Sequence, residues 1–278
     1  MLYASVSEGF RSGGYNIQMF SDLIQASMRN DLMRSLSDDP TLGPRMGRYM
    51  AIGENPSADS TTVFRPERSW NYEVGTRLSL FKGHLTANAA LFYIMVSDQQ
   101  ITRFAAGNGL GRQVLNAGKS QSYGMEISLS GWFNMGHNPL RLTANYGYTH
   151  ATFTNYDAGI SDGQVLDYDG NFLPFAPRHT FSASADYLFP IRAAIMDVGV
   201  NTNGLGRTYW TEDNTSSQSY YQLLGAHFGV RYKIFNLTLW ATNLTNKRYT
   251  PFYFVSRGQG FAQCSRPRQF GATLSLRF

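Results

Sequence analysis

The sequence predicts an all-β protein, an antiparallel transmembrane β-barrel whose strands have one apolar and one polar face. Apolar and polar side chains alternate from Gln269 to Phe278, the last residue given. Successive side chains of a strand point to opposite faces, so this segment predicts a strand between an apolar phase and water. Short and long connections also alternate along the chain, as they do in outer-membrane barrels. A soluble β-sandwich can alternate as well, but its strands are usually shorter than these, so the length of the strands favours a barrel.

Composition agrees with a membrane protein that crosses the bilayer by strands. Of the 278 residues, 42% are hydrophobic and only 15% are charged. The longest apolar run, Ala89–Val96, is far shorter than the roughly 20 residues of a spanning helix. The net charge of +5 is spread along the chain, and we expect no nucleic-acid partner. The single cysteine, Cys264, excludes a disulfide within the chain.

Ten segments are predicted as strands from their alternation and composition. In chain order they are Leu2–Arg11, Ser69–Phe81, Leu85–Ile101, Ser120–Trp132, Leu140–Phe153, His179–Phe189, Met196–Tyr209, Tyr220–Tyr232, Asn236–Leu244 and Gln269–Phe278. The second strand shows the two faces clearly, because Trp70 and Val74 share one face while Glu73 and Arg77 share the other. Charged side chains on one face predict a water-filled lumen on that side.

The connections predict the orientation of the barrel. Four are tight turns: Lys82–His84, Phe133–Pro139, Pro190–Ile195 and Lys233–Phe235. Five are long and rich in Gly, Ser, Asn and Asp: Ser12–Arg68, Thr102–Lys119, Thr154–Arg178, Trp210–Ser219 and Thr245–Arg268. Outer-membrane barrels have short periplasmic turns and long extracellular loops, so we expect the long connections to lie outside the cell.

The first long connection is predicted to contain a short amphipathic helix. Ser21 is a suitable N-cap, and Ile24, Met28, Leu32 and Leu36 follow at helical spacing. We expect this apolar stripe to pack on the barrel rim.

Several short motifs, in order along the chain, resemble one family. They are Tyr3-Ala4-Ser5 with Gly9-Phe10-Arg11 and the following Ser-Gly-Gly-Tyr-Asn; Pro66-Glu67 with Trp70-Asn71-Tyr72-Glu73-Val74-Gly75; Asn116-Ala117-Gly118 with Ser122-Tyr123-Gly124-Met125-Glu126; Ala176-Pro177-Arg178-His179; and Leu239-Trp240-Ala241-Thr242-Asn243-Leu244 with Lys247-Arg248-Tyr249. Together they resemble the C-terminal barrel of TonB-dependent outer-membrane receptors of the ferric-siderophore type. The resemblance covers nearly the whole chain.

The resemblance implies a fold, a location and a function. Residues 1–278 would be the C-terminal part of a receptor barrel, about ten of roughly 22 strands, without the plug domain that gates the pore. The protein would lie in the outer membrane, in contact with its lipid, and import a scarce ligand with energy from TonB. A ferric siderophore is the first choice of ligand, with haem and cobalamin as alternatives. TonB would be contacted through an N-terminal part absent from this sequence, which also lacks a signal peptide, so we expect the chain to be a fragment or a truncated reading frame.

Two sets of functional residues are predicted, and all of them except Arg11 lie near the C-terminus. The C-terminal set resembles the signal read by the barrel-assembly machinery: Gln269, Gly271, Leu274, Leu276 and Phe278. The candidate ligand-binding residues combine aromatic rings with arginines, which suit an anionic aromatic chelate such as a ferric catecholate: Arg11, Tyr253, Phe254, Arg257, Phe261 and Arg266. Packing between neighbouring loops explains the same aromatic residues.

No cofactor and no catalytic residue are predicted. One loop gathers Asp157, Asp162, Asp167 and Asp169, which offer oxygen ligands for a calcium ion, although such residues are usually just solvated and their spacing is not that of an EF-hand. The five histidines are far apart in the sequence. Two alternatives stay open: a self-contained ten-stranded outer-membrane protease, with His150 near Asp157 and Asp162 as its catalytic material, and a passive porin.

Overall fold

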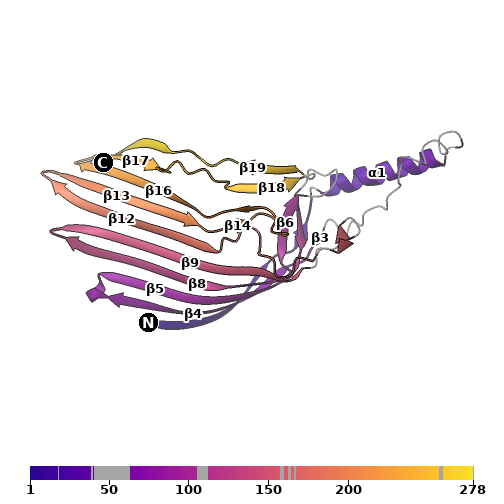
Figure 1. The fold of residues 1–278 in the computed structure, drawn as a ribbon, viewed down its shortest axis with the longest axis horizontal. Helices are drawn as coiled ribbons and strands as arrows, with labels where there is room; N and C mark the ends of the chain where they lie inside the picture. Colours follow the sequence, from indigo (N-terminus) through magenta and orange to yellow (C-terminus); the bar gives the residue numbers. More distant parts are fainter. Residues whose placement is uncertain are drawn as a thin grey trace.

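The computed structural model contains one antiparallel sheet of ten strands, and this confirms the predicted fold class (Figure 1). It describes residues 1–17, 19–38, 40, 63–104, 112–156, 160–161, 164–165, 167–256 and 259–277. The strands, whose order in the sheet is their order in the chain, are β1 (Leu2–Arg11), β4 (Glu67–Leu80), β5 (Leu85–Ser97), β8 (Gly118–Met135), β9 (Asn138–Tyr156), β12 (His179–Ile191), β13 (Ala194–Leu205), β16 (Tyr221–Tyr232), β17 (Phe235–Thr242) and β20 (Gln269–Leu276). Each corresponds to one predicted strand.

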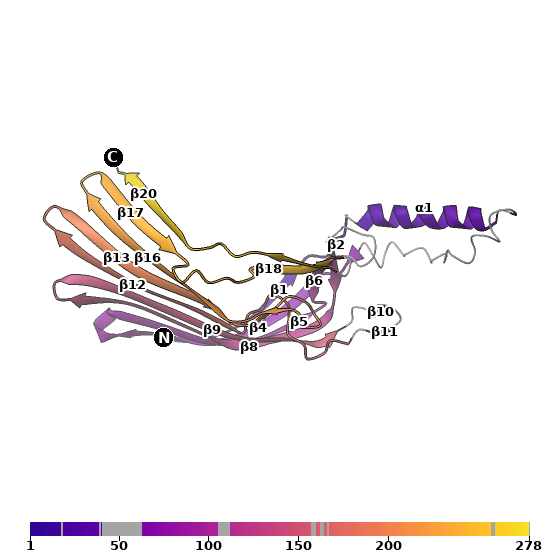
Figure 2. The same ribbon diagram turned by 45° about the horizontal axis from the view of Figure 1, so that its top comes forward.

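The described sheet is an open wall with β1 at one edge and β20 at the other. Tight turns join its strands at one end, one of them containing the 3-10 helix Phe81–Gly83. The long connections gather at the opposite end, where Figure 2 shows them extending beyond the strands. The two kinds of connection therefore separate to the two ends of the wall, as the sequence predicts.

The register places apolar and polar side chains on opposite faces of the wall. Val74 of β4 pairs with Leu91 of β5, which pairs with Met125 of β8. All three lie on the apolar face, and Val74 and Leu91 are exposed. On the polar face, Tyr3 donates a hydrogen bond to Glu73 Oε1 at 2.7 Å. A sheet whose exposed face is apolar suits contact with lipid rather than with water.

Glycines on the polar face are covered by side chains of the wall itself. The ring of Tyr3 occupies the space in which a Cβ of residue 75 would lie. At Gly124 the same space is filled by the backbone oxygen of Tyr148 and the ring of Phe92. These glycines therefore let neighbouring strands and rings lie close and flat.

Among the described residues, five short strand pairs lie in the long connections. The sequence predicts most of their residues as loop, although Gln100–Ile101 and Thr208–Tyr209 fall at the ends of predicted strands. The pairs are β2 (Gly14–Tyr15) with β3 (Val63–Phe64), β6 (Gln100–Phe104) with β7 (Arg112–Asn116), β10 (Ile160–Ser161) with β11 (Gln164–Val165), β14 (Thr208–Tyr209) with β15 (Ser217–Gln218), and β18 (Phe252–Ser256) with β19 (Gln259–Gln263). Among the described residues, the buried apolar side chains also gather at this end: Ile101, Ala117, Ala151, Phe153 and Tyr156. The small core therefore stabilises the loops and not the middle of the wall.

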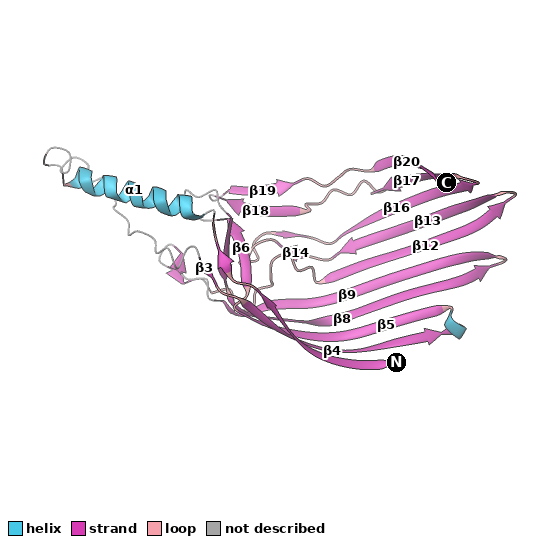
Figure 3. Cartoon of the chain, turned by 180° about the vertical axis from the view of Figure 1, so that it is seen from behind, coloured by secondary structure: helices cyan, strands magenta, loops and turns pink. Residues whose placement is uncertain are grey.

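The predicted helix exists but differs from the prediction in its start and its packing. It is α1 (Met19–Ser37), so Ser21 lies inside its first turn instead of capping it. Figure 3 shows α1 projecting away from the sheet, and Phe20, Ile24, Met28 and Leu32 are 44% to 67% exposed. The segment contains neither Gly nor Pro, the two residues that disfavour a helix interior most. In the part of the chain that the structure describes, no helix has both the length and the apolar character to cross a bilayer.

Candidate functional site

The candidate ligand-binding loop is a folded hairpin at the loop end of the wall. Strands β18 and β19 pair over their whole length, with Phe254 opposite Phe261. The hairpin lies in the connection between β17 and β20, and β6 of another hairpin contacts β18 (Figure 1). This position brings residues from distant parts of the sequence together above the wall.

Five aromatic rings form a continuous row across three of the long connections. We call this the aromatic row; its members are Trp210, Phe175, Phe252, Phe254 and Phe261. Successive ring centroids are 5.4, 5.7, 5.8 and 5.1 Å apart. Such spacing is typical of favourable aromatic contacts, so the row fixes the three connections to one another. It also presents Phe261, which is 49% exposed, at one end.

The structure brings some of the predicted residues together and separates others. Phe254 and Phe261 stack at 5.1 Å with an interplanar angle of 14°. Tyr253 alternates with Phe254 along β18, and its ring instead lies over Gly260 on the other face of the hairpin. Arg257 lies outside the described residues. Phe252, an aromatic residue of the same loop, lies in the row as well, whereas Phe175 and Trp210 were not predicted as partners, because nothing in a loop sequence shows which distant loops meet.

The two remaining arginines lie at opposite edges of the sheet. Arg266 is exposed, and its backbone oxygen accepts a hydrogen bond from Asn243 Nδ2 at 3.0 Å, which fixes the chain next to β20. Arg11 ends β1 at the other edge, where it pairs with Glu67 of β4. The strand order therefore does not place Arg11 beside the hairpin.

The polar face carries a cluster of two aspartates and one histidine that the sequence does not predict. Asp186, Asp197 and His227 come from β12, β13 and β16, and His227 Nε2 lies 3.2 Å from Asp197 Oδ2 and 3.8 Å from Asp186 Oδ1. The imidazole lies over Gly199, where no side chain intervenes. Strand register creates this cluster, and its members are separated by 11 to 41 positions in the sequence. The spacing of His and Asp along the sequence gave no signal for it.

The four aspartates considered for calcium do not form a described site. Asp157 and Asp162 lie outside the described residues. Asp169 accepts a hydrogen bond from the backbone of Tyr156, and Asp167 Oδ1 accepts one from the backbone N–H of Asp169 at 3.0 Å. These bonds give the two carboxylates a structural role in the loop. Within the described ranges, no group of three or more His, Cys, Asp or Glu side chains is arranged to hold a metal ion.

The C-terminal residues of the predicted assembly signal lie on both faces of β20. Leu274 and Leu276 are exposed on the apolar face, whereas Gln269 and Gly271 lie on the polar face. Trp240 covers Gly271, and Trp240 Nε1 donates a hydrogen bond to Thr273 Oγ1 at 3.3 Å. Phe278 lies outside the described residues.

An antiparallel wall with an apolar outer face, tight turns at one end and folded aromatic loops at the other defines an outer-membrane β-barrel. The family profile described as TonB dependent receptor-like, beta-barrel matches residues 1–244, and the chain belongs to that family. The outer-membrane location predicted from the sequence is confirmed by this membership. The protease and the porin are therefore not favoured.

Similar proteins of known name are receptors and transporters. The chain is 28% identical over 249 residues to the pesticin receptor of Yersinia enterocolitica, covering 87% of this chain and 34% of that protein. It is 26% identical over 190 residues to the probable TonB-dependent siderophore receptor PiuA of Acinetobacter baumannii, covering 66% of this chain and 24% of that protein. The chain thus spans about a third or less of the length of these relatives.

Solved structures share the fold. The ferric yersiniabactin uptake receptor FyuA from Yersinia pestis superposes with a TM-score of 0.70 at 23% identity, over 100% of this chain and 35% of that one. The ferric preacinetobactin receptor BauA from Acinetobacter baumannii gives 0.62 at 18% identity, over 99% of this chain and 34% of that one. The copper transporter OprC gives 0.64 at 15% identity, over 100% of this chain and 37% of that one.

Proposed function

We propose that the protein is part of an outer-membrane receptor that binds a ferric siderophore and imports it with energy from TonB. Membership in the TonB-dependent receptor family over residues 1–244 carries this proposal. Two similar proteins, a probable siderophore receptor and a ferric yersiniabactin uptake receptor, support the choice of ligand class. Residues 1–278 would form one segment of barrel wall, coupled to TonB through another part of the receptor.

The aromatic row supports a ligand site at the loop end of the wall. Phe254 and Phe261 present stacked rings on a hairpin whose chain continues to Arg266. Aromatic rings with nearby cations suit a planar anionic chelate, because the rings contact its faces and the guanidinium binds its charged oxygens. We assign the ligand-binding role to Phe254, Phe261 and Arg266, with Tyr253 on the other hairpin face, and Arg11 and Arg257 as further candidates. The C-terminal residues of β20 would be read by the barrel-assembly machinery.

Uptake of radioactive ferric siderophores by iron-starved cells tests the proposal. Cells lacking the receptor gene are compared with cells that express the receptor or a variant, using a panel of catecholate and phenolate chelates. We expect deletion to abolish uptake of at least one chelate, and Phe261→Ala to reduce that uptake about tenfold, since losing one aromatic contact costs roughly 1 to 2 kcal/mol. Phe235→Ala, at the opposite end of the wall, is the matched control.

The outcomes distinguish a failure of the proposed function from a failure of the proposed ligand site. If deletion leaves uptake of every chelate unchanged, the receptor does not import ferric siderophores. If deletion abolishes uptake but the Phe261 variant behaves like the Phe235 variant, the function holds and the assignment of the hairpin is wrong.

A further inference from the structure

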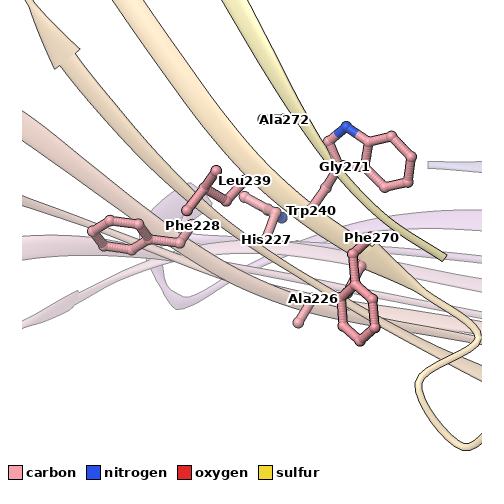
Figure 4. Close-up of a pocket in the computed structure, with 9 residues that line it drawn as sticks. Ala226, His227, Phe228, Leu239, Trp240, Phe270, Gly271 and Ala272 are labelled. Atoms are coloured by element: carbon pink, nitrogen blue, oxygen red, sulfur yellow. The ribbon is translucent and has the colours of Figure 1, made fainter. Parts of the chain in front are cut away.

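The apolar face of the wall has a groove near its C-terminal edge. It has a volume of about 560 Å³ and lies across β16, β17 and β20. Small and large apolar side chains line it together: Ala226, Ala241 and Ala272, with Phe228, Leu239 and Phe270. Figure 4 shows Phe270 and Ala226 on one side of the strands and the indole of Trp240 on the other. The groove is therefore a feature of the lipid-facing surface, and its lining is suited to an acyl chain.

A fixed cation lies directly above the groove. Arg268 precedes β20 by one residue, and its guanidinium carbon is 5.9 Å from the ring centroid of Phe270. Arg268 Nη1 also donates a hydrogen bond to the backbone oxygen of Leu244 at 3.3 Å. One side chain thus connects the loop after β17 to the upper end of the groove, with its charge at the loop end of the wall.

Two further cations are held in the same turn by a buried asparagine. Asn243 is only 6% exposed, and it binds the backbone of Lys247 through both its oxygen and its nitrogen, at 2.8 and 3.0 Å. Lys247 and Arg248 are exposed. The backbone N–H of Arg268 is bound by Asn246 Oδ1 at 3.0 Å, so the turn and the start of β20 form one unit. The backbone that carries these cations is therefore held in place before any ligand binds, which lowers the entropic cost of binding.

No acidic side chain balances these charges in this part of the sequence. Asp213 is the last acidic residue, and residues 214–278 contain eight basic ones. They are Arg231, Lys233, Lys247, Arg248, Arg257, Arg266, Arg268 and Arg277. A turn that carries Lys247, Arg248 and Arg268 above an apolar groove is complementary to an amphiphile with an anionic head and hydrocarbon chains.

We propose that the groove and the turn around Asn243 bind a lipid of the outer leaflet that carries phosphate groups and several acyl chains. The phosphates contact Arg268, Lys247 and Arg248, and one acyl chain lies along Ala226 and Ala241. Arg268 can donate charge-assisted hydrogen bonds to phosphate oxygens. In a zwitterionic lipid the quaternary amine offsets the charge of the phosphate, so we expect that lipid to bind less well. The site faces the bilayer, so it is separate from the loop site proposed for import.

Native mass spectrometry of the delipidated receptor in detergent tests this site. The probes are diphosphorylated lipid A, phosphatidylcholine and inorganic phosphate. We expect lipid A to bind much more tightly than phosphatidylcholine, and Arg268→Gln to weaken lipid A binding about fivefold, the effect of one basic residue near an anionic headgroup. Lys233→Gln is the matched control, because Lys233 lies over the ring of Tyr232 at 5.4 Å in a tight turn at the other end of the wall.

A second pair of variants tests the groove without changing charge. Ala241→Phe fills the groove with apolar atoms and should reduce lipid A binding, whereas Leu274→Phe, on the apolar face of β20, should leave it unchanged. Each variant is first shown to migrate as a folded, heat-modifiable barrel on gels. Equal binding of lipid A and phosphatidylcholine, or equal behaviour of the Arg268 and Lys233 variants, would overturn the proposal. Unchanged binding after Ala241→Phe, or competition by inorganic phosphate at the same concentration as lipid A, would overturn the role of the groove.

Discussion

Single glycines decide how closely the strands of this wall approach. A Cβ on residue 124 would collide with the backbone oxygen of Tyr148, whereas the atoms nearest to a Cβ on residue 75 belong to the side chain of Tyr3. A side chain can rotate away, but a paired strand cannot move without disturbing its hydrogen bonds. We therefore expect Gly124→Ala to destabilise the folded barrel by about 1 to 3 kcal/mol and Gly75→Ala by less. Urea unfolding of the receptor in detergent micelles measures both.

A double variant checks the reason for the difference. Tyr3→Ala removes the ring that covers Gly75. The double variant with Tyr3→Ala and Gly75→Ala should therefore be no less stable than the variant with Tyr3→Ala alone. The same change should give no relief to Gly124→Ala. If Tyr3→Ala reduced the destabilisation caused by both glycine substitutions, the Tyr148 backbone would not be the cause of the cost at residue 124.

The carboxylate of Asp213 makes one loop sensitive to acid. Burial raises the pKa of Asp213, but hydrogen bonds from Thr211 and from the backbone and hydroxyl of Thr215 outweigh burial and hold the pKa below its ordinary value of 3.8. A carboxyl group with a lowered pKa stabilises the folded loop above pH 3.8, and this stabilisation is lost as the pH falls through the folded-state pKa. We expect pepsin to cleave the 211–215 turn faster as the pH falls through this range. Asp213→Asn should remove the part of the pH dependence that comes from this carboxylate. A cleavage-versus-pH profile that the substitution leaves unchanged would contradict this prediction.

At the scale of elements, two long connections are tied together by one asparagine. Asn214 accepts a hydrogen bond from the backbone of Phe172 at 2.7 Å and donates one to its oxygen at 2.9 Å. Its φ of +57° also favours Asn or Gly over other residues. The side chain also donates a hydrogen bond to the backbone oxygen of Thr211 at 3.2 Å. We expect Asn214→Gly, which keeps the backbone conformation, to lose only these side-chain hydrogen bonds, about 1 to 3 kcal/mol. Asn214→Ala adds backbone strain and should cost more.

Hydrogen exchange separates these two effects. Both Asn214 variants should speed exchange at Phe172 and in the 211–215 turn, with the alanine variant faster. Exchange in β12 should remain unchanged, because the wall does not depend on this contact. Equal exchange in the two variants would indicate that the backbone conformation contributes nothing.

The sequence predicts the ten wall strands but not the hairpins above them, and the reason is physical. A wall strand such as β8 faces lipid on one side and water on the other, so its side chains alternate. The β18–β19 hairpin lies among other loops, where neither face is uniform and alternation carries no signal. The same limit applies to the candidate site. Composition indicates the aromatic residues near Phe254, whereas the contact of Phe252 with Phe175 depends on tertiary structure.

At the scale of the whole molecule, the register places neighbouring residues of one strand in different environments, one on the apolar face and one on the polar face. Ile127 and Ser128 are adjacent near the middle of β8, with Ile127 on the apolar face and Ser128 on the polar face. A charge on the lipid side must be buried in hydrocarbon, which costs about 2 to 4 kcal/mol near the bilayer centre. We therefore expect Ile127→Lys to reduce the amount of folded, heat-modifiable receptor in outer membranes several-fold. Ser128→Lys adds the same charge one residue away and should be tolerated, because its ammonium group faces the polar side. If the two variants accumulate equally, the apolar face of this wall does not contact lipid.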